Sequence, residues 1–328
     1  MILSLSRRRL AVAAACVLAA AAAPAAFAQQ DFPNKGLRII VPFSAGGSSD
    51  VQGRMLAERL SRVYKQTVVV DNRPGAGGHI GGRAVAEGPA DGYTLMLGSI
   101  GLHATYGVYK RLAYDPATNF KVLTVLAEMP HVIVANPALP AANVKELVTL
   151  ARKRPGALNF GSAGIGSSVH MIGELFKVTA DAPMTHVPYK GSAGAMNDLL
   201  GGQIELMFEN PPTTLAHIRS GKLKALAVTG KARNSALPEV PTVAESGFPG
   251  FEATSWTTVA VSAKVPDAIA DKLSADIRKI ILSPEFVEAL AAQGMTPVAS
   301  SREAAAKFIA AEKKRWDRVI QKADLVAD

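Results

Sequence analysis

Hydrophobic positions along the chain follow two alternating spacings. Short β-branched or apolar runs, at 37–41 for example, predict buried strands. Between such runs the apolar residues recur at helical spacing, and in 51–64 this places Leu56, Leu60 and Val63 on one face. Strand and helix signals alternate almost from end to end, which is typical of α/β domains with mainly parallel sheets.

Pro and Gly punctuation delimits the individual elements. Strands are predicted at 37–41, 67–70, 94–97, 122–126, 132–135, 158–160, 185–187, 204–208, 225–228 and 256–261. Helices are predicted at 51–64, 144–152, 171–179, 193–200, 213–219, 267–282 and 302–322. Their order predicts two lobes, each a mainly parallel sheet flanked by helices: 29–127 with 255–328 form the first lobe, and 128–254 form the second.

Twice, a strand leads through a Gly/Ser-rich turn directly into a helix. The first turn is 42–50 after the strand at 37–41, and the second is 161–170 after 158–160. Such a turn directs free backbone N–H groups and the positive end of a helix dipole at one point, which suits an anion. Two such turns far apart in sequence predict two lobes that close on one acidic ligand.

The first residues have the pattern of an export signal. Three arginines at 7–9 precede an apolar stretch at 10–23, and Ala26-Phe27-Ala28 supplies a small-x-small cleavage pattern. We expect cleavage after Ala28 and a periplasmic mature chain, with the choice between Sec and Tat export open. Cys16, the one cysteine of the sequence, lies in this segment. The mature chain therefore has no disulfide, thiol nucleophile or Cys-ligated metal.

Composition narrows the range of partners. The formal charge of +9 falls to +6 without the three signal arginines, and this excess is spread along the chain. A nucleic-acid surface needs clustered basic and aromatic residues, so none is predicted. Aromatic residues make up 6%, which argues against a sugar site of stacked rings. Six scattered histidines predict no metal site, and without a phosphate-loop motif we expect no cofactor.

Six motifs in order carry a family resemblance. They are Ile-Val-Pro-Phe-Ser-Ala-Gly-Gly-Ser-Ser-Asp (40–50), Asn-Arg-Pro-Gly-Ala-Gly-Gly (72–78), Asp-Gly-Tyr-Thr-Leu (91–95), Gly-Ser-Ala-Gly-Ile-Gly-Ser-Ser-Val-His (161–170), His-Val-Pro-Tyr-Lys-Gly (186–191) and Val-Pro-Thr-Val-Ala-Glu-Ser-Gly (240–247). From Phe32 onward the chain resembles the extracytoplasmic solute receptors of tripartite tricarboxylate transporters, the Bug family. The resemblance implies a two-lobe periplasmic binding protein of the type II, Venus-flytrap kind. It would act as a monomer that traps a small organic acid and presents it to the transporter's membrane subunits.

The resemblance also implies which residues bind the ligand. They are Phe43, Ser44, Ala45, Gly46, Gly47, Ser48, Asp50, Ser99, Gly101, Gly161, Ser162, Gly164, Gly166, Ser167, Ser168, His170, Tyr189, Gly191 and Asn210. Glu209 stands where family members commonly have Asp, and a longer acid there would shorten or recharge the distal pocket. The identity of the ligand therefore stays open among di- or tricarboxylates, acidic or amidated amino acids and aromatic acids.

Two other functions fit parts of the sequence. A binding lobe can serve a signalling partner in place of transport, and the sequence does not separate these uses. An exported serine hydrolase would use Ser48, Ser162 or Ser167 with His170 and Asp50. The chain lacks a G-x-S-x-G elbow, and a histidine only a few residues from its serine is poorly placed as a general base. The sequence therefore favours a receptor without catalytic activity.

Overall fold

The computed structural model describes residues 32–327. The predicted signal peptide and its cleavage site after Ala28 lie outside the described residues. From Gly36 onward the chain forms one compact unit. No helix in the described part of the chain combines the length and the apolar character needed to cross a bilayer.

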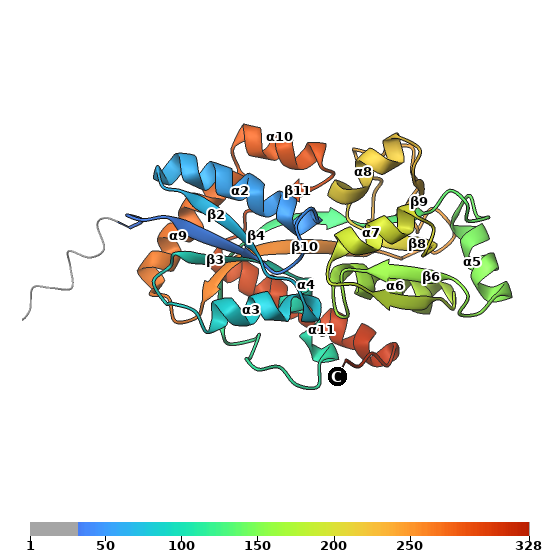
Figure 1. Cartoon of the computed structure of the whole chain (residues 1–328), viewed down its shortest axis with the longest axis horizontal. Helices are drawn as coiled ribbons and strands as arrows, with labels where there is room; N and C mark the ends of the chain where they lie inside the picture. The colour runs from blue at the N-terminus through green and yellow to red at the C-terminus, as the bar shows by residue number, and fades with distance from the viewer. Residues whose placement is uncertain (1–31, 328) are drawn as a thin grey trace, which may run out of the picture. The chain divides into compact units, whose positions relative to one another are not determined.

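The first sheet takes its strands from the first part of the chain, blue through teal to green in Figure 1, and from its last part, in orange. Its order is β11-β4-β10-β3-β1-β2, with β1 parallel to β2 and β3, and β10 antiparallel to β3 and β4. The strands are β1 (Leu37–Val41), β2 (Val68–Asn72), β3 (Thr94–Ser99), β4 (Phe120–Pro130), β10 (Thr254–Ser262) and β11 (Thr296–Pro297). The helices of these segments are α2 (Ser48–Tyr64), α3 (His79–Ala86), α4 (Ile100–His103), α9 (Asp267–Ile281), α10 (Pro284–Ala292) and α11 (Arg302–Lys322).

The second sheet comes from the middle of the chain, green to yellow in Figure 1. Its order is β7-β6-β8-β5-β9, with β6 parallel to β7 and β8, and β5 antiparallel to β8 and β9. The strands are β5 (Val132–Ala135), β6 (Asn159–Ser162), β7 (Thr185–Pro188), β8 (Leu206–Glu209) and β9 (Lys224–Val228). The helices are α5 (Val144–Lys153), α6 (Ser168–Ala180), α7 (Ser192–Leu200) and α8 (Pro211–Arg219).

The α/β fold with two sheets is confirmed, but the sheets are mixed and not mainly parallel. The chain leaves the first sheet along β4, enters the second along β5 and returns along β10. These three strands run antiparallel to their neighbours, because a strand that carries the chain from one sheet to the other enters without a crossover helix. The sequence pattern predicts where strands lie, but it does not predict whether these connecting strands run parallel or antiparallel to their neighbours.

The structure also corrects some local predictions. Helices α3 and α10, the one-turn helix α4 and the short strand β11 were not predicted. Leu56 and Leu60 are fully buried on α2 as expected, but the side chain of Val63 is 54% exposed. Val63 lies in the last turn of α2, beyond the part of the helix that packs on the sheet.

Candidate functional site

The turn between β1 and α2, residues 42–49, is here called the α2 elbow. Asp50, in the first turn of α2, accepts hydrogen bonds from the Gly46 backbone N–H (3.0 Å), Asn72 Nδ2 (3.0 Å) and Arg54 Nε (2.9 Å). Burial raises the pKa of Asp50, but these hydrogen bonds outweigh it, and the net pKa lies below its ordinary value. The Asp50 carboxylate thus ties the elbow to the helix and to the end of β2.

The turn between β6 and α6, residues 161–168, is the α6 elbow. Ser167 is the N-cap of α6: its Oγ accepts from the His170 backbone N–H and donates to the Gly164 carbonyl at 2.7 Å. Ser162 Oγ accepts from the Gly164 backbone N–H at 3.1 Å. Gly164 and Gly166 have φ of +122° and +76°, a conformation that favours glycine. Ser162 and Ser167 therefore hold the Gly164 end of the elbow.

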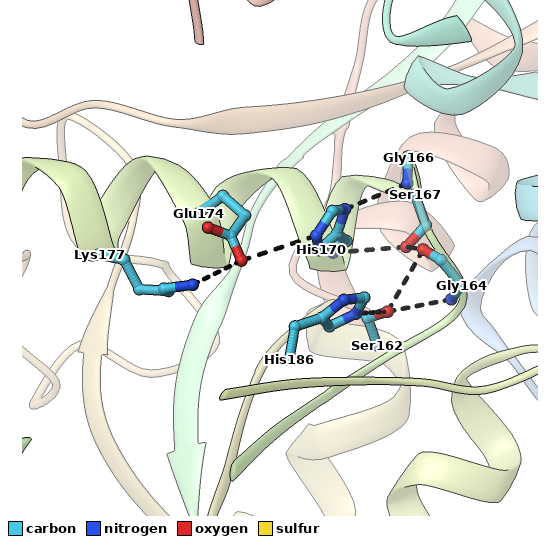
Figure 2. Close-up of polar contacts among 8 residues, drawn as sticks. All are labelled: Ser162, Gly164, Gly166, Ser167, His170, Glu174, Lys177 and His186. Carbon is cyan, nitrogen blue, oxygen red and sulfur yellow. Dashed lines mark hydrogen bonds and ion pairs between the residues drawn. The ribbon is translucent and has the colours of Figure 1, made fainter. Parts of the chain in front are cut away.

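Figure 2 shows two histidines behind the α6 elbow. His170 Nδ1 accepts from the Gly166 backbone N–H at 3.1 Å, and its Nε2 lies 3.7 Å from Glu174 Oε1. His186 Nε2 lies 2.6 Å from Ser162 Oγ. Burial lowers the pKa of His170 to about 2 and that of His186 to about 4, so both rings are uncharged at neutral pH.

A small cavity lies where the two elbows meet. Its described lining residues are Phe43, Gly47, Ser48, Ser49, Gln52, Ser99, Met129, Ala163, Ser167, Ser168, Val169, Ser192, Asn210, Ser255, Trp256 and Thr257. The free space inside is about 30 Å³. Four helices begin at this cavity: α2 with Ser48, α6 with Ser168, α7 with Ser192 and α8 with its N-cap Asn210.

The electrostatics of this cavity come from backbone and not from charged side chains. None of the described residues that line it is Lys, Arg, His, Asp or Glu. The N-termini of α2, α6 and α7 supply positive potential and unpaired N–H groups instead. Helix α8 begins with Pro211 and Pro212, which have no N–H, so it adds only the positive end of its dipole. Ser99 is 7% exposed and its buried Oγ has no hydrogen-bond partner among the described residues. Such a buried, unpaired hydroxyl at the cavity wall is suited to a polar ligand.

Asn210 lines the cavity, and Glu209 precedes it in the chain without lining the cavity. Glu209 is fully buried, and its Oε1 accepts from the Asn210 backbone N–H (2.7 Å) and Asn210 Nδ2 (2.8 Å). Asn210 Oδ1 accepts from Ser255 Oγ at 3.1 Å. The carboxamide of Asn210 is therefore held between a residue of the second sheet and one of β10.

The structure brings some of the predicted residues to the cavity and leaves others outside it. Those that line it are Phe43, Gly47, Ser48, Ser99, Ser167, Ser168 and Asn210. Those that do not line it are Ser44, Ala45, Gly46, Asp50, Gly101, Gly161, Ser162, Gly164, Gly166, His170, Tyr189 and Gly191. Ala45 and Gly46 are exposed, while a Cβ on Gly191 would lie 2.1 Å from Ser44 Oγ. Direct ligand contact by each of these residues stays a prediction.

Several lining residues were not among the predicted ones. They are Ser49, Gln52, Met129, Ala163, Val169, Ser192, Ser255, Trp256 and Thr257. Gln52 follows Ser48 by one helical turn, so helical spacing gave a usable signal for it. Met129 and Ser255 lie within the long strands β4 and β10, where no turn or motif marks a site.

Two mixed sheets flanked by helices, with a cavity at converging helix N-termini, fit the fold of a solute-binding protein. Residues 53–325 match the model of the tripartite tricarboxylate transporter family receptor, and the chain belongs to this family. It is 39% identical over 310 residues to Protein BugT of Bordetella pertussis, covering 93% of this chain and 94% of that protein.

Solved structures agree with this assignment. The structure of R. palustris Rpa4515 with adipate is 37% identical, has a TM-score of 0.88 and covers 90% of this chain and 99% of its own. The periplasmic binding protein BugD is 34% identical, has a TM-score of 0.86 and covers 90% of this chain and all of its own. The family is one of solute receptors and not a class of enzymes.

The geometry of the serines agrees with a structural role. Ser162 is fully buried, and its neighbour is His186 and not His170. Its Oγ already accepts the Gly164 N–H, so it holds the elbow and does not face the cavity. Asp50 lies on the other elbow with three donors of its own. The residues named for a serine hydrolase therefore do not assemble into a triad.

Proposed function

We propose that this chain is a periplasmic receptor that binds a small organic acid by its carboxylate at the cavity between the two elbows. It then delivers the acid to the membrane subunits of a tripartite transporter. The observation that carries the proposal is the convergence of four helix N-termini on a cavity without charged lining side chains. Backbone N–H groups and serine hydroxyls are donors that suit a carboxylate oxygen.

The magnitudes support two elbows acting together. A helix terminus contributes about 0.3–1 kcal/mol, and about 2 kcal/mol when partly buried. A hydrogen bond to a charged group adds about 1.5–3 kcal/mol. Micromolar affinity needs about 8 kcal/mol of binding free energy after the cost of ordering both partners has been subtracted. One helix terminus with two such hydrogen bonds gives about 5–6 kcal/mol at the middle of these ranges, which is below this value. Twice as many donors, from both elbows on one desolvated carboxylate, exceed it.

Binding requires the elbows to separate and close. A free space of about 30 Å³ is close to the volume of one water molecule and too small for an organic acid. We propose that residues 36–127 with 255–327 move against 128–254, with β4 and β10 near their junctions acting as the hinge. The closed form would present a surface that a membrane partner recognises.

The relatives support an acid as the ligand. Rpa4515 was solved with adipate, whose two carboxylates lie at the ends of a flexible chain. We transfer only a carboxylate group to this chain, and we assign the helix N-termini that line its cavity to hold that group. The predicted signal peptide and the periplasmic relative BugD support a periplasmic location.

A thermal-shift screen of the chain from Gln29 to Asp328 tests the binding step. The protein is unfolded and refolded to remove bound ligand, then mixed with carboxylates, amino acids, sugars and phosphorylated metabolites. A ligand at 100 times its dissociation constant adds about 2.7 kcal/mol, a shift of several degrees in melting temperature. A carboxylate hit without turnover supports the proposal. Shifts with sugars or phosphates alone, or consumption of the ligand, would overturn it.

Delivery is tested in cells. Deleting the gene should abolish uptake of the acid found in the screen, and the wild-type gene should restore it. Unchanged uptake in the deletion strain would contradict the transport step and favour a ligand sensor.

A further inference from the structure

We propose that His170 and His186 are positioning residues for the ligand site. They lie behind the α6 elbow and hold its backbone so that the first amides of α6 face the cavity. Neither histidine is among the residues that line the cavity, and His170 is 3% exposed. The inference rests on the proposed function, because it assigns the two rings to the same carboxylate site.

His170 fixes the Gly166 end of the elbow. Its Nδ1 accepts the Gly166 backbone N–H at 3.1 Å, so this nitrogen carries no proton. The hydrogen of the neutral ring is then on Nε2, which faces Glu174 Oε1 at 3.7 Å, and Glu174 in turn accepts from Lys177 Nζ at 2.9 Å (Figure 2). Gly166 has φ of +76°, and the bond to His170 holds this backbone conformation.

His186 fixes the Gly164 end. Its Nε2 lies 2.6 Å from Ser162 Oγ, and the same Oγ accepts the Gly164 backbone N–H at 3.1 Å. The rings of His170 and His186 stack with centroids 3.9 Å apart and planes at 26°. Phe160 also packs against His186, with ring centroids 5.0 Å apart. The two histidine rings thus form one rigid support.

This support divides the amides of the elbow into two groups. The N–H groups of Gly164 and Gly166 bond to side chains of the protein and point away from a ligand. Ser168 and Val169 begin α6 and line the cavity. Their backbone N–H groups have no carbonyl acceptor one turn earlier in the helix. The amides that remain for a carboxylate are therefore those of the helix start, and the histidines determine where that start lies.

Two substitutions at one position separate positioning from packing. Asn carries Oδ1 near the place of the histidine Nδ1, so His170→Asn keeps an acceptor for the Gly166 N–H. His170→Leu has similar bulk and no acceptor. Phe176→Leu is the control, because Phe176 is buried on the same helix two turns on and contacts Phe208 and Phe251 and not the elbow.

The readouts are the dissociation constant for the acid found in the screen and the exchange rate of the Gly166 amide hydrogen. We expect His170→Leu to weaken binding about tenfold and His170→Asn to stay within about threefold of wild type. The Gly166 amide should exchange faster in His170→Leu only. Phe176→Leu should lower the melting temperature and leave the affinity unchanged.

Equal affinity of His170→Leu and wild type, or an equal loss in both His170 variants, would overturn the inference. Amide exchange is measured without ligand, so it tests the positioning role even if the screen finds no carboxylate. In that case the proposed function fails. Slow exchange of the Gly166 amide in His170→Asn and fast exchange in His170→Leu would still support the positioning role of His170.

Discussion

Glu209 is a carboxyl group in a position where ionisation is unfavourable. It is fully buried, and its Oε2 has no hydrogen-bond partner among the described residues. Burial raises the pKa of Glu209, and hydrogen bonds from Ser192, Asn210 and Thr213 offset this only in part. Folding therefore shifts the ionisation of Glu209 towards the neutral acid, beside a cavity that we assign to an anion. Protonation of Glu209 would remove its repulsion of a ligand carboxylate.

Glu209→Gln should reveal this linkage. A carboxyl with a raised pKa in the folded state stabilises the fold below its unfolded pKa of about 4.5, and this contribution is lost as the pH rises through the folded pKa. The glutamine side chain keeps an oxygen for the Asn210 donors and does not ionise. The free energy of unfolding of the variant minus that of wild type should therefore increase as the pH rises, by at most about 1.4 kcal/mol per pH unit.

Urea unfolding between pH 4.5 and 8 measures this difference. Glu239→Gln is the matched control, because it makes the same chemical change at an exposed position. If Glu209→Gln loses more stability relative to wild type at pH 8 than at pH 4.5, the folded chain favours the carboxylate form of Glu209.

At the scale of elements, the two elbows differ in how closely neighbouring atoms surround their glycines. Gly46 and Gly164 both have positive φ, +80° and +122°. A Cβ on Gly46 would meet nothing within 4 Å, whereas one on Gly164 would lie 3.1 Å from the Tyr189 carbonyl and 3.5 Å from the Gly77 backbone nitrogen. The sequence treats these positions alike, and the structure separates them: Gly164 is confined by neighbouring backbone.

Gly164→Ala should therefore weaken ligand binding more than Gly46→Ala. We expect about a tenfold loss for Gly164→Ala, from strain and a displaced elbow, and a smaller loss from backbone strain alone for Gly46→Ala. Isothermal titration with the acid from the screen compares them, and circular dichroism confirms that both variants fold. Equal losses in the two variants would mean that the Tyr189 and Gly77 backbone does not confine the α6 elbow.

The α6 elbow also contacts the segment that follows β3. Tyr109 OH donates to the Ile165 carbonyl at 2.8 Å, and Thr105 Oγ1 donates to the Gly166 carbonyl at 2.5 Å. Tyr109→Phe removes one donor and should weaken binding about two- to tenfold, because the closed arrangement loses one hydrogen bond of about 0.5–1.5 kcal/mol. Titration calorimetry measures the affinity.

Tyr114→Phe serves as the control for Tyr109→Phe. Its hydroxyl bonds to His79 Nδ1 at 2.8 Å and does not reach the α6 elbow. Affinity that falls equally in both variants would attribute the effect to general destabilisation and would contradict a role in closure.

The elements that the sequence predicted and missed differ in what determines them. Both elbows were predicted because their Gly and Ser residues act locally, through φ and through capping. Helix α3 was missed because its Gly81 and Gly82 are poor helix formers. They are there for packing: a Cβ on Gly81 would lie 2.9 Å from Pro42 Cα, and one on Gly82 would lie 2.4 Å from Tyr114 OH. Such close approach is tertiary information that local patterns do not contain.

The site residues divide in the same way. Ser48 and Ser168 begin helices and were predicted to bind the ligand, and both line the cavity. Ser255 and Thr257 lie in β10, where the period of two assigns them to one face but not to a cavity. His186 was quoted only as part of a motif, because its bond to Ser162 depends on the parallel pairing of β6 with β7.

At the scale of the whole molecule, buried histidines make stability depend on pH. His79, His103, His131 and His186 have pKa values lowered to about 4 by burial, and that of His170 is lowered to about 2. The lowered pKa means that the unfolded chain binds these protons more readily than the folded chain. Their stabilising contribution is present above pH 6.5 and is lost as the pH falls through the folded pKa values.

We therefore expect the melting temperature to fall as the pH decreases from 7 to 4.5, above the pH at which ordinary carboxylates are half protonated. Glu209 contributes a pH dependence of stability with the opposite sign, and the contribution of five histidines should outweigh that of one carboxyl. His103→Gln should flatten the profile, because Gln does not titrate and can still reach Thr258 Oγ1, the partner of His103 Nε2 at 2.9 Å. A flat wild-type profile between pH 7 and 4.5, or an unchanged slope in His103→Gln, would mean that the buried rings bind protons in the folded chain as easily as in the unfolded one.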